Sequence, residues 1–257
     1  MEDLNISLVQ CNLIWEDKEQ NLTNIRRQIF DQETIADIIL LPEMFSTGFS
    51  MNPAPLAESM SGSTIQWMTD LAKDSDSLIC GSIIIEINSA FVNRFVAVSS
   101  EGVHAYYDKR HLFRMGHEES FYKMGDRRVV FTWKGWRILP QICYDIRFPV
   151  WIRNQGDYDM ALFVANWPEP RREVWKTLLV ARALENQAYV AGVNRIGIDN
   201  SGINHYGDSM IIDPKGAILS ETGNQEIVLS ATLSYDELER FRTKFPAHLD
   251  RDAFTIS

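Results

Sequence analysis

The chain has 257 residues, 45% of them apolar, and is therefore long enough to bury a large hydrophobic core. Its formal net charge of −10 argues against nucleic acid or an anionic membrane surface as the main partner. No apolar run approaches the length of a membrane-spanning helix, and the first residues lack the basic and apolar regions of a secretory signal.

The first half of the chain alternates predicted strands and helices. Residues 5–11 read as a short buried strand, and after residue 17 apolar side chains recur at helical spacing. Residues 38–41 form a second apolar strand, which Pro42 ends and Glu43 follows directly. This order of strand, helix and strand is typical of a βαβ unit. The next predicted elements are a helix from residue 63, a strand at 78–85, and a hairpin of strands 91–98 and 103–107.

The second half repeats this alternation. A polar loop at 114–126 precedes the predicted elements, which are a hairpin of strands 128–132 and 136–143, a strand at 160–165, a helix over 174–188, strands at 189–193, 209–213 and 227–233, and a helix near 235–241. No repeat or linker interrupts the pattern. We therefore expect one α/β domain over residues 1–257, with helices outside one mixed sheet or two sheets.

The cysteine pattern indicates the redox compartment. Cys11, Cys80 and Cys143 are far apart, odd in number, and form no Cys-x-x-Cys pair. Such spacing indicates neither a disulfide framework nor a cysteine zinc site. We expect a reduced cytoplasmic protein, in which a single reactive thiol is chemically possible.

Three predicted strands end on chemically active side chains, namely a carboxylate (Glu43), an ammonium (Lys109) and a thiol (Cys143). Ligands bind at strand ends in α/β proteins, and a sharp turn after a strand holds a nucleophile out of the sheet. Each residue alone also has an ordinary interpretation: a solvated acid, a solvent-facing base or a buried core cysteine. Their combination favours a site.

Six stretches resemble the nitrilase superfamily of carbon–nitrogen hydrolases and cover nearly the whole chain in order. They are LLPEMFSTGF (40–49), YDKRHLF (107–113), QICYDIRFP (141–149), VANWP (164–168), ARALENQAYVAGVNR (181–195) and HYGDS (205–209). Within that superfamily, RHLFRMGHEE, GWRILPQICYDIRFPVW and KFPAHLDRDAF are most similar to the ω-amidase branch.

The resemblance implies a four-layer α-β-β-α sandwich of two mixed sheets and a catalytic triad that needs no metal or organic cofactor. Carried over residue by residue, the triad is Glu43, Lys109 and Cys143. Many members add a glutamate in the loop after the lysine. Glu118 and Glu119 are both candidates, and counting back from the glycine at 125 favours Glu118. The resemblance also implies a homodimer, which we expect to use residues 150–154 and 175–184.

The ω-amidase resemblance implies a small-molecule substrate, the terminal amide of a short 2-oxo dicarboxylic acid monoamide such as 2-oxoglutaramate or 2-oxosuccinamate. The carboxylate of this substrate would require a cation, and Arg147 is a candidate. The alternative role for Arg147 is an ion pair with Asp145 or another acid. The expected walls of the substrate slot are Phe45, Phe113, Tyr144 and Trp167.

Two other functions remain open. One is a related carbon–nitrogen hydrolase that acts on nitriles or N-carbamoyl compounds. The other is a binding protein that keeps the sandwich without its chemistry, and the intact set of Glu43, Lys109 and Cys143 argues against it.

Overall fold

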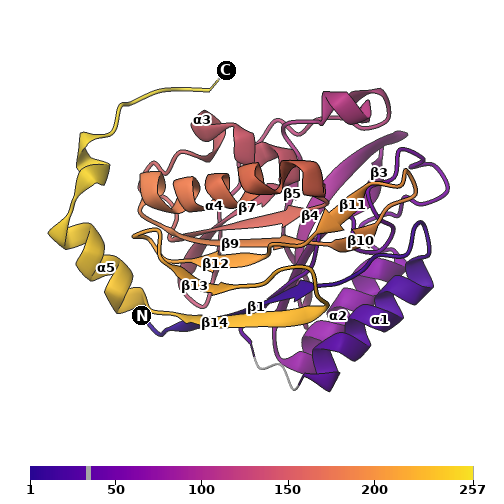
Figure 1. The fold of residues 1–257 in the computed structure, drawn as a ribbon, viewed down its shortest axis with the longest axis horizontal. Coiled ribbons are helices and arrows are strands. Elements are labelled where there is room, and N and C mark those ends of the chain that lie inside the picture. Colours follow the sequence, from indigo (N-terminus) through magenta and orange to yellow (C-terminus); the bar gives the residue numbers. More distant parts are fainter. Residues whose placement is uncertain (33–35, 257) are drawn as a thin grey trace.

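The fold contains two six-stranded sheets (Figure 1), seen in a computed structural model that describes residues 1–32 and 36–256. The first sheet contains, in spatial order, β14 (Ile227–Leu233), β1 (Leu4–Gln10), β2 (Ile38–Leu40), β3 (Leu78–Ile87), β4 (Ala90–Ser99) and β5 (Gly102–Asp108). The second contains β13 (Ile218–Glu221), β12 (Met210–Ile212), β9 (Tyr189–Asn194), β8 (Met160–Ala165), β7 (Trp136–Ile142) and β6 (Phe131–Trp133).

Both sheets are mixed. Strands β1, β2 and β3 are parallel at the centre of the first sheet, and β7, β8 and β9 are parallel in the second. Antiparallel strands flank each centre. Because β5 is antiparallel to β4, which is antiparallel to β3, strand β5 points the same way as β2. The carboxyl ends of β2 and β5 therefore lie at one edge of the first sheet.

Helices cover the outer face of each sheet and complete the four layers. Helices α1 (Lys18–Asp31) and α2 (Ser63–Ser75) pack on the first sheet, and α3 (Pro149–Ile152) and α4 (Arg172–Asn186) pack on the second. The expected α-β-β-α sandwich is confirmed. The remaining elements are α5 (Tyr235–Lys244), the hairpin of β10 (Ile196–Ile198) and β11 (Asn204–Tyr206), and short helical turns η1 (Arg114–Gly116), η2 (Glu118–Ser120), η3 (Cys143–Arg147), η4 (Glu169–Arg171) and η5 (Ala247–Asp250).

The central strands are apolar on both faces because each face packs against a different layer. In β8, Met160, Leu162 and Val164 enter the core between the sheets. The alternate residues of the same strand, such as Phe163, enter the core beneath α4. Such two-sided burial explains why this strand reads as a continuous apolar run in the sequence.

The sequence did not predict the β10–β11 hairpin or β13. Each of these strands has three or four residues, and β13 is largely exposed. Within residues 1–32 and 36–256, no helix combines the length and the apolar character needed to span a bilayer.

Candidate active site

A cavity of about 470 Å³ opens where strands of the two sheets end. Glu43 lies just beyond β2 and Lys109 just beyond β5, both in the first sheet. Cys143 follows β7 and Asn166 follows β8, which are parallel neighbours in the second sheet. Four strand ends thus deliver four polar side chains to one cavity, as the positions of Glu43, Lys109 and Cys143 in the sequence predict.

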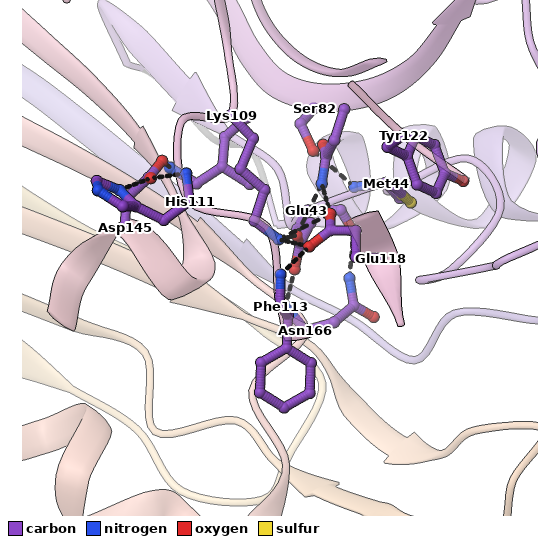
Figure 2. Close-up of polar contacts among 12 residues, drawn as sticks. Glu43, Met44, Ser82, Lys109, His111, Phe113, Glu118, Tyr122, Asp145 and Asn166 are labelled. Atoms are coloured by element: carbon purple, nitrogen blue, oxygen red, sulfur yellow. Dashed lines mark hydrogen bonds and ion pairs between the residues drawn. The ribbon is translucent and has the colours of Figure 1, made fainter. Parts of the chain in front are cut away.

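The Lys109 ammonium lies between two carboxylates, and all three side chains are fully buried (Figure 2). Its Nζ is 2.8 Å from Glu43 Oε1. The same nitrogen is 2.9 Å from Glu118 Oε2 and 3.0 Å from Glu118 Oε1. An ammonium has three N–H donors, so these three carboxylate oxygens occupy all of them.

Two asparagines and a backbone amide support the carboxylates. Asn93 Nδ2 donates to Glu43 Oε1 at 2.8 Å and to Glu118 Oε1 at 3.4 Å. The backbone N–H of Asn166 donates to Glu43 Oε2 at 2.9 Å, and its side chain donates to the Glu43 carbonyl. The backbone N–H of Phe113 donates to Glu118 Oε2 at 2.6 Å. These directional contacts fix both carboxylates in one orientation, and neither asparagine was predicted from the sequence as a site residue.

The ionisable side chains of this cluster shift one another's pKa values. Burial alone would lower the pKa of Lys109, but the carboxylates of Glu118 and Glu43 raise it above its usual value, so the ammonium is retained. Burial raises the pKa of Glu118, and the neighbouring charge of Glu43 adds to that rise, while Lys109 opposes it.

Cys143 is the first residue after β7, and its backbone has a φ of +45°. A non-glycine residue in this left-handed region is strained, and such strain is a feature of nucleophiles held on a sharp turn after a strand. Burial and the charge of Glu43 raise the pKa of the Cys143 thiol well above its usual value, while Lys109 lowers it. The resting thiol is therefore protonated and requires a base.

The two candidate second glutamates differ sharply in their surroundings. Glu118 is fully buried against Lys109, whereas the Glu119 side chain is exposed to solvent. Consecutive side chains of a 3₁₀ turn point about 120° apart, so turn η2 can direct Glu118 to Lys109 and leave Glu119 in solvent.

Four of the five expected substrate-contacting residues line the cavity, namely Phe113, Tyr144, Arg147 and Trp167. The prediction for Phe45 is wrong. Phe45 is fully buried in the core beneath the first sheet, where its ring centroid is 6.0 Å from that of Trp67. Met44 has a φ of +43°, and this local reversal of the chain places Glu43 at the cavity and Phe45 in the core.

Two guanidinium groups face the cavity. Arg147 lies 5.1 Å from the ring centroid of Trp167, and in the described ranges 1–32 and 36–256 it forms no ion pair within 4.0 Å. Asp145 is bound to other groups, so the alternative of an Arg147–Asp145 pair is wrong. Arg171, which was not predicted from the sequence, lies 5.4 Å from the ring centroid of Phe113. Burial, with the neighbouring charge of Arg147, lowers the pKa of Arg171.

Comparisons with known proteins show which proteins the chain is similar to. A family model for carbon-nitrogen hydrolases matches residues 5–243. The chain is 48% identical to omega-amidase YafV of Escherichia coli K12 over 100% of both proteins, and 34% identical to 2-oxoglutaramate amidase of Bacillus subtilis over 95% of this chain and 96% of that protein. A CN-hydrolase superfamily protein from Xanthomonas campestris, whose crystal structure has an arsenic adduct in the active site, is 42% identical, with a TM-score of 0.97 over 100% of both chains.

The first prediction concerns the three thiols. Cys143→Ala should reduce turnover by about 10³-fold or more, because only Cys143 lines the cavity. Cys11 and Cys80 are buried in the apolar cores on the two faces of the first sheet, away from the cavity, so a substrate does not reach either thiol. Ammonia release by purified variants, with circular dichroism as the control for folding, measures the effect. An inactive Cys11→Ala, Cys80→Ala double variant that remains folded would contradict the assignment.

The second prediction separates the adjacent glutamates. Glu118→Gln removes one of the two charges that hold Lys109, and kcat should fall by about 10²-fold. Glu119→Gln is the matched control, and because its side chain is exposed its kcat should stay within about twofold of the wild type. Steady-state kinetics of both variants compares them, and equal losses would remove the special role of Glu118.

Proposed function

The chain belongs to the carbon-nitrogen hydrolase family, and from this premise we propose that it is a cysteine-dependent amidase with Glu43, Lys109 and Cys143 as its catalytic triad and Glu118 as a further active-site acid. One observation carries the proposal: a buried ammonium lies between two buried carboxylates, next to a thiol that faces a cavity. A non-catalytic binding protein would have no need to maintain this costly arrangement.

In the first half-reaction the Cys143 sulfur attacks the amide carbon while Glu43 accepts the thiol proton. Glu43 then gives that proton to the nitrogen, and the C–N bond breaks to release ammonia and leave a thioester. Without this donation the leaving group would be an amide anion. A positioned acid–base group of this kind typically contributes about 10²–10⁴-fold to the rate.

The oxyanion that forms during the attack requires positive charge and hydrogen-bond donors. The backbone N–H of Tyr144, next to the nucleophile, can donate to it. Lys109 contributes its buried positive charge, because its three N–H donors already contact Glu43 and Glu118. One oxyanion donor typically supplies roughly 3–4 kcal/mol of transition-state stabilisation.

In the second half-reaction water replaces the departed ammonia. Glu43, again a carboxylate after it has given up its proton, takes a proton from this water as the water attacks the thioester. The backbone N–H of Tyr144 and the charge of Lys109 again stabilise the oxyanion. The C–S bond then breaks, Glu43 returns the proton to the sulfur, and the acid product and the free thiol are released. Each residue thus serves both half-reactions.

We propose a short 2-oxo dicarboxylic acid monoamide, such as 2-oxoglutaramate or 2-oxosuccinamate, as the substrate. The relatives named omega-amidase and 2-oxoglutaramate amidase support this choice. The cavity supports it as well, since Arg147 and Arg171 face it while Phe113 and Trp167 supply apolar walls. The substrate carboxylate would contact these guanidinium groups, and the amide would reach Cys143.

The third prediction tests this substrate class. We expect ammonia release from 2-oxoglutaramate and succinamate, and values of kcat/KM lower by orders of magnitude for simple aliphatic amides and nitriles, because those leave the partly buried guanidinium groups of Arg147 and Arg171 without a carboxylate partner. Arg147→Ala should raise KM for the carboxylate substrates by about tenfold or more. It should also narrow the difference in kcat/KM between these substrates and the simple amides and nitriles. The exposed Arg127 is the matched control, and Arg127→Ala should leave KM and this difference in kcat/KM unchanged. The highest kcat/KM for a nitrile or an N-carbamoyl amino acid would contradict the substrate assignment.

We further propose that the enzyme is a cytoplasmic homodimer. Exposed apolar side chains occur on α3 (Val150) and α4 (Leu184), within the segments that the sequence analysis names as the interface. Phe245 and Leu249, beyond α5, are also exposed apolar residues near the end of the chain. Burying such side chains is the usual driving force for stable association.

The fourth prediction concerns this assembly. Light scattering at micromolar concentration should give twice the protomer mass of 29.5 kDa. Val150→Asp should shift the mass toward the protomer value, because a carboxylate would be buried at the proposed interface. Val103→Asp, which also alters an exposed valine but lies on β5, is the control. A wild-type mass equal to that of one protomer would contradict the proposal.

A further inference from the structure

The proposed triad is divided between the two sheets. Glu43 and Lys109 follow strands of the first sheet, whereas Cys143 follows a strand of the second. Hydrogen bonds within one sheet therefore cannot fix the position of the ammonium relative to the thiol. The core between the sheets is apolar, and apolar packing is not directional. Directional contacts between the sheets are needed at this edge; Asn166 provides them for Glu43, and the segments of Lys109 and Cys143 need their own.

Asp145, two residues after the nucleophile, makes such a contact. Its side chain is fully buried, and its two oxygens accept four hydrogen bonds. Oδ2 accepts from the backbone N–H of Ile142 at 3.1 Å and from the hydroxyl of Tyr107 at 2.9 Å. Oδ1 accepts from the backbone N–H of His111 at 2.9 Å and from its Nδ1 at 2.8 Å (Figure 2). Because a carboxylate only accepts, His111 carries a proton on Nδ1.

Three of these four donors flank Lys109 in the sequence. Tyr107 precedes the lysine by two residues and His111 follows it by two. The Tyr107 hydroxyl also accepts from the backbone N–H of Arg110 and from Trp151 Nε1, each at 3.1 Å. The backbone on both sides of Lys109 is therefore attached to the segment that carries the nucleophile.

The ring of His111 adds a second link between the same two segments. It stacks on Phe148, with ring centroids 3.7 Å apart and planes 6° apart. Phe148 directly follows turn η3, which begins with Cys143. The His111 ring is therefore held at its edge by Asp145 and on its face by Phe148.

We propose that Asp145 is a positioning residue that sets the location of the Lys109 ammonium relative to the Cys143 thiol, through Tyr107 and His111. The inference rests on the proposed function, in which Lys109 and Cys143 act together. Asp145 is not one of the residues that line the cavity in the described ranges, so it acts through these neighbours and not on the substrate. A displacement of about 1 Å in a catalytic group can cost about 10²-fold in rate.

Asp145→Asn tests the proposal, because the amide keeps the shape of the side chain but replaces one acceptor oxygen with a donor that faces two donors. We expect kcat to fall by about 10²-fold with KM changed by less than about threefold. The rate of Cys143 alkylation by iodoacetamide provides an independent measurement. The charged groups that face the thiol are Glu43, Lys109 and Arg171, and Lys109 lowers the pKa of the thiol. Movement of the ammonium away should therefore shift the alkylation profile to higher pH.

A matched variant separates positioning from stability alone. Asp159, directly before β8 of the second sheet, is also a buried carboxylate and accepts hydrogen bonds from Arg137 and Arg242 away from the cavity. Asp159→Asn should lower the melting temperature while kcat and the alkylation profile below that temperature remain those of the wild type. If Asp159→Asn changes kcat and the alkylation profile as much as Asp145→Asn does, Asp145 is merely structural and the proposal is overturned.

Variants of the two donors keep the proposal testable if Asp145→Asn does not fold. Tyr107→Phe should reduce kcat by about tenfold and shift the alkylation profile in the same direction. His111→Asn keeps a side-chain donor at the position of Nδ1 and should retain more activity than His111→Leu. Wild-type kcat and an unshifted profile in Tyr107→Phe and in His111→Leu would overturn the proposal. Turnover by Cys143→Ala would instead show that the proposed function itself has failed.

Discussion

The buried contact of Lys109 with Glu43 and Glu118 is the constraint on which the rest of the site depends. Removing a charge from water costs several kcal/mol even after relaxation, and the mutual attraction of opposite charges recovers this cost only when the geometry is good. Here two negative charges face one positive charge, so an excess negative charge remains. Hydrogen bonds from Asn93, from the backbone of Asn166 and from the backbone of Phe113 compensate part of it. Burying any one of these three charged side chains would be costly in free energy without the other two.

This excess charge determines the state of the thiol. A thiolate at Cys143 would add a second uncompensated negative charge next to Glu43, which is one reason why the pKa of the thiol is raised. In the proposed mechanism the thiol proton therefore moves to Glu43 as the sulfur attacks, so that the charge of the buried cluster stays constant until the oxyanion forms. An arrangement that disfavours the free thiolate also protects the nucleophile from adventitious oxidation, since the thiolate is the reactive form.

The sequence predicted the parts of the site that follow from local pattern. Glu43, Lys109 and Cys143 could be found because each directly follows an apolar or alternating run. Asn93 could not, because it lies within β4 and only the pairing of β4 with its neighbours brings its amide between two glutamates. The error for Phe45 has a similar origin, since the backbone reversal at Met44 leaves no mark in the residue pattern. Local rules locate strand ends, and long-range pairing determines what meets there.

The distribution of charge along the cavity sets the direction in which a substrate can bind. Glu43 lines the cavity beside Cys143, and Glu118 lies on the other side of Lys109, so this side of the cavity carries an excess of negative charge. Arg147 and Arg171 also line the cavity, lie close to the rings of Trp167 and Phe113, and form no ion pair in the described part of the chain. If the substrate is a monoamide of a dicarboxylic acid, its carboxylate is repelled from the side of Glu43 and attracted by the arginines, which leaves the neutral amide next to Cys143. Hydrolysis then creates a carboxylate beside that of Glu43. The same field that orients the substrate therefore weakens the binding of the product, and one charge arrangement favours both productive entry and release.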